Sequence, residues 1–167
     1  MLPDGVEEAL PTTAWRVEGL RRALLDHYRA HSYELILPPL IEHLDTLLSG
    51  AGSDLEEQTF KLTDPVGGRL LGLRSDMTPQ AARIAARHFA DVPVVRLCYL
   101  GTVLRSRPDS LGGSRAPRQV GCEVFGERAL GAWGEGVFGG KDGSFFDHSK
   151  FRNVSGFGIL ACLYSRV

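Results

Sequence analysis

The sequence predicts an α+β domain in which helices flank a mostly antiparallel sheet. Three observations carry this prediction: short β-rich runs set apart by turn signals, helical apolar patterns early and midway in the chain, and a long strand pair that ends near residue 126. The length of 167 residues suits one domain and is too short for two ordinary ones. With 43% hydrophobic and 23% charged residues, the chain is expected to be soluble and to bury a core without disulfides.

Composition and charge exclude several classes of function. The formal net charge of -1 gives no global sign of a nucleic-acid-binding surface, so tRNA is not expected as a partner. No apolar run is long enough to span a bilayer and the start lacks a signal-peptide pattern, which predicts a cytoplasmic protein without a membrane partner. The cysteines, expected to be small buried residues without metal-ligand spacing, are Cys98, Cys122 and Cys162. No histidine has a second ligand at metal spacing, and no cofactor-binding motif is present, so neither a metal nor a cofactor is expected.

The first third of the chain is predicted to hold an arm, a helix, a strand and a second helix. Residues 1–11 read as irregular, and Thr12 or Thr13 is expected to cap the helix that follows. The apolar residues that recur at helical spacing on this helix are Trp15, Leu20, Leu24 and Tyr28. Residues 34–40 are predicted to form a strand that two prolines end, and residues 41–49 a short helix with Gly50 as its C-terminal stop.

The middle of the chain predicts a hairpin, a helix and a long strand pair. Two strand-like runs flank residues 64–68 (DPVGG), which have strong turn chemistry. Thr78 is expected at the N-cap of the next helix, with Pro79 at its first position. Residues 94–105 form a β-rich run, a loop follows over 107–117, and a further strand ends at Gly126.

Three stretches within residues 2–126 carry a family resemblance. Residues 33–52 resemble the dimer-forming first motif of class II aminoacyl-tRNA synthetases, in which a strand runs into a proline. Residues 58–86 resemble the segment that opens the amino-acid pocket, and residues 94–126 resemble the second motif, two antiparallel strands joined by a loop. In this order the stretches resemble histidyl-tRNA synthetase and its relative, the regulatory subunit of ATP phosphoribosyltransferase. The resemblance implies a partial class II synthetase-like core that associates with itself through residues 33–52.

Four residues are candidates for a histidine pocket. Gln119 and Glu123 are four apart on one predicted strand, so they point to the same face. The resemblance implies that they line the pocket with Asp76 and Thr78, where Asp76 receives the ammonium group, Gln119 orients the ligand and Glu123 pairs with a cation. The alternative is that Asp76 and Glu123 are ordinary solvated or capping carboxylates.

The nucleotide side departs from the synthetase pattern. Active synthetases carry Arg-x-Glu where the second motif enters its loop. One alignment puts Leu104 and Ser106 at those places, and the other puts Arg105 and Arg107 there. Either way the acid is absent, and an arginine cannot accept a hydrogen bond from the adenine amine, which argues against adenylate formation. The arginines of the loop can hold an anion, contact a partner or be merely solvated: Arg105, Arg107, Arg115 and Arg118.

The resemblance implies a non-catalytic regulatory subunit of a glycosyltransferase complex. Such a subunit joins a short-form catalytic ATP phosphoribosyltransferase in the first step of histidine biosynthesis, supports its activity and relays feedback by histidine. The alternatives are a fragment of the catalytic domain of histidyl-tRNA synthetase, which is an ATP-dependent ligase, and a defective fragment without activity. Residues 127–167 lack the downstream motifs of the family and, apart from an apolar run over 157–164, show no clear pattern. They are expected to be a tail outside the 1–126 core, produced by truncation or a frame shift.

Overall fold

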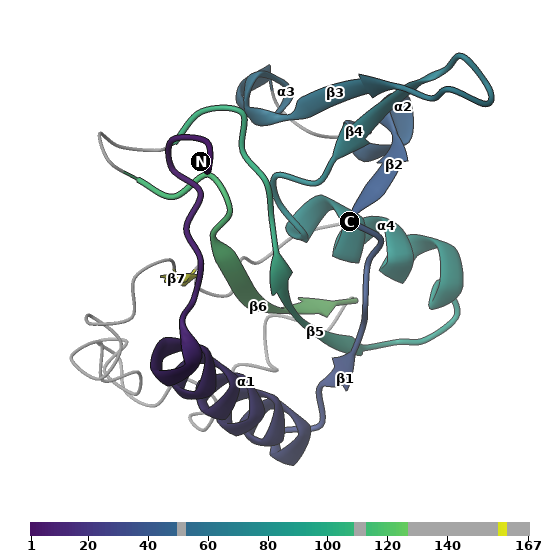
Figure 1. Ribbon diagram of the computed structural model, residues 1–167. Coiled ribbons are helices and arrows are strands. Elements are labelled where there is room, and N and C mark those ends of the chain that lie inside the picture. The colour runs from purple at the N-terminus through teal and green to yellow at the C-terminus, as the bar shows by residue number, and fades with distance from the viewer. Residues whose placement is uncertain (50–52, 109–112, 127–156, 160–167) are drawn as a thin grey trace.

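The computed structural model describes residues 1–49, 53–108, 113–126 and 157–159 (Figure 1). In chain order its elements are α1 (Pro11–Ala30), β1 (Glu34–Leu35), β2 (Ile41–His43), α2 (Leu44–Leu47), α3 (Ser53–Gln58), β3 (Phe60–Thr63), β4 (Leu70–Leu73), α4 (Thr78–His88), β5 (Val95–Thr102), β6 (Arg118–Phe125) and β7 (Phe157–Ile159). The described strands form one sheet in the order β1-β5-β6-β7 and a smaller one in the order β2-β4-β3. The mixture of helices and sheets agrees with the predicted α+β class.

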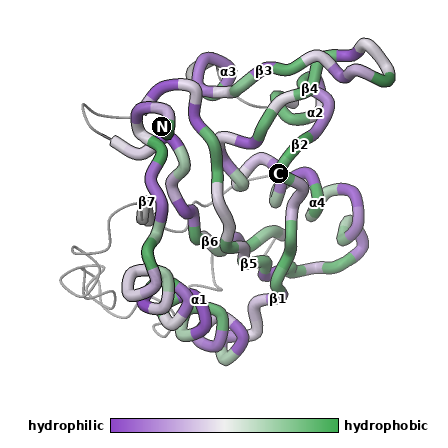
Figure 2. The backbone as a smooth tube through the Cα atoms, in the orientation of Figure 1, coloured by the Kyte–Doolittle hydropathy of each residue, from purple (hydrophilic) through white to green (hydrophobic). Residues whose placement is uncertain are grey.

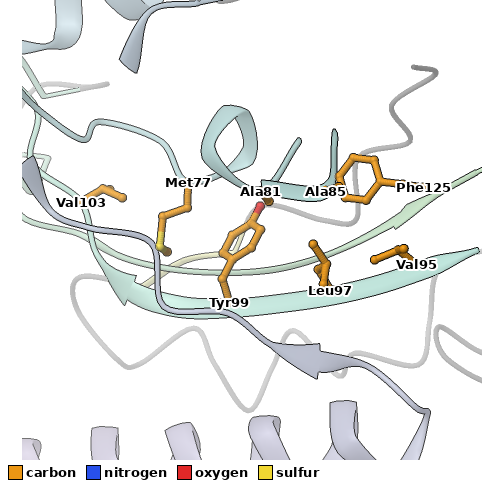
Figure 3. Packing of buried hydrophobic residues seen from close by; sticks show 8 residues of the cluster. All are labelled: Met77, Ala81, Ala85, Val95, Leu97, Tyr99, Val103 and Phe125. Atoms are coloured by element: carbon orange, nitrogen blue, oxygen red, sulfur yellow. The ribbon is translucent and has the colours of Figure 1, made fainter. Parts of the chain in front are cut away.

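The larger sheet lies between α1 on one face and α4 on the other (Figures 1 and 3). Its centre is the predicted antiparallel pair of β5 and β6, in register from Val95↔Phe125 to Thr102↔Arg118. Because successive strand residues point to opposite faces, the pair builds two cores. The core under α1 contains Leu24, Tyr28, Tyr33, Cys98, Val120, Cys122 and Val124. The core under α4 contains Met77, Ala81, Ala85, Val95, Leu97, Tyr99, Val103 and Phe125.

The pairing differs in one respect from the mostly antiparallel expectation. β5–β6, β2–β4 and β3–β4 are antiparallel, but β1 pairs with β5 in parallel and β7 pairs with β6 in parallel. A parallel pair needs a long connection, and β1 and β5 have one, since the chain leaves this sheet after Leu35 and returns to it only at Val95.

The first helix is present, but its predicted cap and one of its apolar positions are wrong. The helix begins at Pro11 after Leu10, and no side chain caps it, because the N-cap residue Leu10 has no side-chain acceptor. The buried residues of α1 are Val17, Leu24 and Tyr28. Trp15 is 71% exposed, because it lies two residues before Val17 and is therefore rotated by roughly 200° from the buried face. Hydrophilic and hydrophobic residues accordingly alternate along α1 (Figure 2).

The region after α1 contains less strand and less helix than predicted. Of residues 34–40, only Glu34–Leu35 form a strand, and of residues 41–49 only Leu44–Leu47 form a helix. Residues Ile41–His43 are instead the strand β2, because they find unpaired backbone on β4 at Leu71–Leu73. The expected stop at Gly50 lies outside the described residues.

The predicted hairpin and the helix after it are confirmed, with a shift at the helix start. The turn is closed by the Gly68 N–H donating to Asp64 O at 2.9 Å, and Gly68 has a φ of 67° that favours glycine. α4 begins at Thr78 with Met77 at the N-cap, so Thr78 and Pro79 each lie one position further into the helix than expected. The reason is local: the Thr78 N–H is already satisfied by the carboxylate of Asp76, at 2.8 Å.

Both limbs of the loop between β5 and β6 are tied to other parts of the chain. On the first limb, Ser106 donates its hydroxyl to Glu57 O at 2.7 Å and its N–H to Gln58 O at 2.8 Å. On the second limb, the Arg115 N–H donates to Gly5 O in the N-terminal arm at 2.6 Å. These bonds fix where the loop leaves and re-enters the sheet.

The remaining sequence predictions fall partly outside the described residues. Cys98 and Cys122 are buried, with exposed fractions of 2% and 0%, as expected for small apolar residues, whereas Cys162 is outside the description. Of the apolar run 157–164, only Phe157–Ile159 is described, as the strand β7. The prediction of a separate tail over 127–167 otherwise lies outside the described residues. Among the helices that the structure describes, none combines the length and apolarity that crossing a membrane requires.

Candidate functional site

The site lies where the start of α4 meets the first residues of β6. Gln119, which is 2% exposed, donates from Nε2 to Asp76 Oδ1 at 2.7 Å, and its Oε1 accepts the Met77 N–H at 2.8 Å. Both ends of the amide are therefore engaged, which fixes its orientation. Asp76 Oδ1 also accepts the Thr78 N–H, while Oδ2 accepts no hydrogen bond within the described residues. Asp76 thus combines a capping role with an oxygen left over for a ligand.

Tyr99 connects this group to Glu123. Its hydroxyl lies 2.8 Å from Thr78 Oγ1 and donates to Glu123 Oε1 at 3.0 Å. When the tyrosine proton goes to the carboxylate, the tyrosine oxygen is free to accept a proton from the Thr78 hydroxyl. Figure 3 shows the Tyr99 ring rising from β5 with its hydroxyl directed at the first turn of α4. The structure thereby brings all four predicted pocket residues into one hydrogen-bonded network.

The sequence analysis missed Tyr99, although the strand pattern contained a signal for it. Tyr99 is the register partner of Gly121, which lies midway between Gln119 and Glu123 on the same face. A Cβ on Gly121 would lie 2.5 Å from the Tyr99 hydroxyl oxygen and 2.6 Å from Cζ. The Tyr99 ring therefore occupies the space that the missing side chain of Gly121 leaves, and a larger residue at this position would displace the ring.

Within the described residues, the site carries negative charge without a paired cation. Glu123 is 2% exposed, and its Oε2 is buried with no hydrogen-bond partner among the described residues. Burial raises the pKa of Glu123 from 4.5 to about 7, the hydrogen bond from Tyr99 opposes this rise, and the nearby charge of Asp76 adds to it. Burial, and then the charge of Glu123, also raise the pKa of Tyr99. None of the ion pairs within the described residues involves Asp76 or Glu123.

The loop arginines do not gather into one anion site. The Arg115 side chain lies over the Phe60 ring, with Cζ 5.0 Å from the centroid, and its Nε donates to Arg105 O at 3.2 Å. The Arg105 N–H donates in turn to Arg115 O at 2.9 Å, so the two residues bridge the limbs of the loop. Arg107 is exposed beyond this bridge. These contacts show a structural role for Arg115 and leave Arg107 in contact with solvent.

Arg118 lies on the opposite face of the sheet from Gln119. It lines a cavity of about 440 Å³ together with residues of α1 such as Glu18 and Arg21 and with Leu100 of β5. This placement follows from strand alternation, since Arg118 shares the face of Val120 that packs beneath α1. The predicted loop arginines are therefore divided between two faces.

Metal binding has no support in the part of the chain that the structure describes. No group of three or more His, Cys, Asp or Glu side chains there is placed to hold an ion. The ionisable groups of the site are two carboxylates and a tyrosine on a hydrogen-bonded network, which suits a cationic organic ligand.

Comparison with known proteins assigns the family. Residues 5–135 match the family model described as histidyl-tRNA synthetase. The chain belongs to the histidyl-tRNA synthetase family. The match includes every residue of the Asp76 network and extends beyond residue 126, where the sequence pattern becomes unclear.

Several curated relatives of this chain share one name. The chain is 59% identical over 131 residues to the ATP phosphoribosyltransferase regulatory subunit of Thioalkalivibrio sulfidiphilus, covering 78% of this chain and 33% of the relative. It is 56% identical over 126 residues to the protein of that name from Hahella chejuensis, covering 75% of this chain and 31% of the relative. The chain therefore spans about a third of the length of the curated relatives it matches.

A solved structure confirms the predicted fold class. The crystal structure of an ATP phosphoribosyltransferase regulatory subunit/histidyl-tRNA synthetase from Bacillus halodurans has a TM-score of 0.61 and 26% identity, over 72% of this chain and 30% of that one. The chain therefore has part of a histidyl-tRNA-synthetase-like core as its fold, as the three sequence stretches indicated.

Proposed function

We propose that this chain acts as a regulatory subunit of ATP phosphoribosyltransferase, in the cytoplasm, in the first step of histidine biosynthesis. The support is the name shared by relatives that are 48–59% identical to it. The sequence agrees, because the acid that contacts adenine in an active synthetase is absent at the entrance to the loop. In this proposal the chain performs no ligase chemistry, and the phosphoribosyl transfer belongs to a short-form catalytic subunit.

Histidine is the proposed effector, and the network around Glu123 is its proposed site. The observation that carries this proposal is a buried carboxylate oxygen, Glu123 Oε2, that lacks a donor on a network shared with Asp76. Leaving a buried acceptor unsatisfied costs about 1–3 kcal/mol, so a site of this kind is suited to a ligand that brings N–H donors. Histidine brings an ammonium group for Asp76 and an imidazole N–H for Glu123.

Self-association is proposed through residues 33–52. Four apolar residues in this stretch are exposed, with exposed fractions of 46%, 80%, 44% and 45%: Leu35, Leu37, Leu40 and Ile41. Exposed apolar side chains of this kind are ones that a second copy can cover. Sedimentation of the wild type and of Leu37→Glu checks the proposal, since the variant should shift a dimer towards the monomer. A wild type that is monomeric at all concentrations would contradict it.

Titration with L-histidine tests the proposed site. Chemical shifts of the 167-residue chain should change first at β6 and at the start of α4, and Glu123→Ala should weaken binding by roughly 1.5–3 kcal/mol, the value of a hydrogen bond to a charged group. Glu57→Ala, at an exposed carboxylate on α3, is the matched control and should leave the affinity unchanged. Equal affinities of wild type and Glu123→Ala would show that Glu123 is an ordinary structural carboxylate.

Two activity assays separate the proposed role from the ligase alternative. With a short-form catalytic subunit, addition of the regulatory subunit should raise the rate of phosphoribosyl transfer, and histidine should then lower it. Histidine-dependent exchange of pyrophosphate into ATP should remain at the level of a control without protein. Exchange above that control, with no effect on the catalytic subunit, would favour the ligase.

A further inference from the structure

Cys98 and Cys122 lie directly opposite each other across the β5–β6 pair. Both side chains belong to the core beneath α1, with exposed fractions of 2% and 0%, and both are thiols rather than members of a disulfide. The cysteines that the structure describes therefore share one strand pair, one face and one position along the ladder.

The hydrogen bonds around Cys98 show which kind of cross-strand pair it forms. In an antiparallel ladder, pairs that are hydrogen-bonded to each other alternate with pairs that are not. Val103, which continues the register opposite Pro117, donates its N–H to Pro117 O at 3.0 Å. Position 98 is an odd number of residues away from position 103, so Cys98 and Cys122 are a pair without mutual hydrogen bonds. The Cys98 carbonyl accordingly accepts the Ile36 N–H, just after β1, at 2.9 Å.

A cross-strand pair of this kind brings two thiols within bonding range. Its Cα atoms are about 4.5 Å apart, and disulfides span Cα separations of about 4.4–6.8 Å. Directly opposite Cβ atoms are about 4.5–5.5 Å apart, against about 3.5–4.5 Å in a disulfide, so the strands must twist slightly to close the bond. A disulfide closed in this way is strained and therefore easily reduced again.

Burial limits how fast this pair can react. Burial, and then the charges of Cys122 and Glu34, raise the pKa of Cys98 to about 12. Because the thiolate is the form that attacks a disulfide, the packed pair is nearly inert at neutral pH. Reaction therefore requires the cover provided by α1 to open, and Leu24 of α1 is packed in the same cluster as both cysteines.

We infer that Cys98 and Cys122 form a reversible disulfide by exchange with a low-molecular-weight disulfide. One cysteine thiolate attacks a sulfur of the small disulfide and releases one small thiol, which leaves a mixed disulfide on the protein. The second cysteine thiolate then attacks the protein sulfur of the mixed disulfide, closes the Cys98–Cys122 bond and releases the second small thiol. Two electrons pass to the small disulfide, and the two protons of the protein thiols go to the released thiols.

This bond would tie β5 to β6 directly behind the Tyr99 network. Tyr99 follows Cys98 and Glu123 follows Cys122, and both of these side chains point to the opposite face of the sheet, where they share a hydrogen bond. Oxidation therefore fixes the spacing of the strands beneath that hydrogen bond. The inference does not depend on which ligand the network binds.

The test maps disulfides after incubation in a glutathione buffer that contains both forms and is mostly oxidised. The folded 167-residue chain is incubated at about pH 8, its remaining thiols are blocked, and trypsin releases each cysteine in a peptide of its own. These peptides are 97–105, 119–128 and 153–166, which contain Cys98, Cys122 and Cys162 in that order. Mass spectrometry should find 97–105 linked to 119–128 in most chains, and dithiothreitol should separate the two peptides.

Three variants control this measurement. Cys162→Ala should give the same linked peptide in the same yield, and Cys98→Ala should give none. Leu24→Ala, which loosens the cover over the pair, should reach the wild-type yield at least about fivefold faster.

Refolding removes slow access to the buried thiols as an explanation of a negative result. Wild type that is refolded from urea in the same glutathione buffer should give the linked peptide in the same yield as the folded chain. If the refolded chain leaves Cys98 and Cys122 unlinked, the strand geometry does not favour the bond and the inference is overturned. Stable glutathione adducts on either cysteine, or a link from either one to Cys162, would overturn it as well.

Discussion

Glu123→Gln should make the protein more stable at high pH and less able to bind histidine. The substitution keeps the shape of the side chain and an oxygen that can accept the proton of Tyr99, but it removes a charge that is almost fully buried. In the unliganded protein that charge has one hydrogen bond and no paired cation within the described residues. Its removal should therefore relieve a cost of folding and at the same time remove the partner of the ligand.

The size and sign of this effect follow from the pKa of Glu123. The pKa rises from 4.5 to about 7 on folding, so the folded state holds the proton more tightly than the unfolded state. Stability from this group is therefore complete below pH 4.5 and is lost as the pH rises towards 7. A pKa rise of this size corresponds to about 3 kcal/mol in the free energy of unfolding. We expect roughly 2 kcal/mol, because the charge of Asp76, which contributes to the rise, is partly exposed to water and therefore screened.

Urea denaturation from pH 4 to pH 8.5 measures this prediction. Glu123→Gln and the wild type should have similar free energies of unfolding at the acid end, and the variant should gain roughly 2 kcal/mol on the wild type by pH 8. Glu57→Gln on the exposed side of α3 should follow the wild type throughout. A difference between Glu123→Gln and the wild type that is independent of pH, or that grows on acidification, would refute the reasoning about the buried charge.

Two further predictions concern packing on either side of the sheet, and both are measured by equilibrium denaturation. Gly121→Ala should destabilise the protein by about 1–3 kcal/mol because its Cβ meets the buried Tyr99 ring, whereas Gly19→Ala, with nothing within 4 Å on α1, should stabilise it by up to about 1 kcal/mol. A neutral Gly121→Ala would show that the ring can move aside. Leu24→Ala should cost about 2–4 kcal/mol, and Trp15→Ala, on the exposed face, less than about 0.5 kcal/mol, so a large loss in Trp15→Ala would contradict the orientation of α1.

The parts of the fold that follow from local chemistry could be predicted from the sequence. The turn residues Asp64 and Gly68 specify the hairpin because their conformational needs are met within a few residues. The same is true of Gln119 and Glu123, whose separation of four residues on a strand is enough to place both on one face. The gathering of the proposed pocket around α4 then depended on the family resemblance, which supplied Asp76 and Thr78.

The parts that depend on distant partners could not be predicted in this way. Ile41–His43 form a strand because β4 offers a free edge, which no pattern within residues 41–49 records. Tyr99 appears as an ordinary apolar strand residue until the register places it opposite Gly121. Arg74 looks like a solvated charge next to a turn in the sequence, and its hydrogen bonds to Thr102 O and Pro38 O show where its guanidinium lies.

The two faces of the sheet carry different kinds of side chain, and this difference supports the proposal that the chain binds an amino acid without activating it. Under α1 the strands present Cys98, Cys122 and Val120, which belong to a cluster of mostly apolar buried residues. Under α4 they present a tyrosine, an amide and a carboxylate on one network, and such a network stabilises a fold less well than apolar packing when one of its atoms lacks a partner. An apolar residue at Glu123 would remove that cost, so the carboxylate is best explained by a ligand that completes its hydrogen bonds. The adenine-contacting acid of active synthetases is absent from the loop entrance, which agrees with the proposal that the site binds an amino acid without activating it.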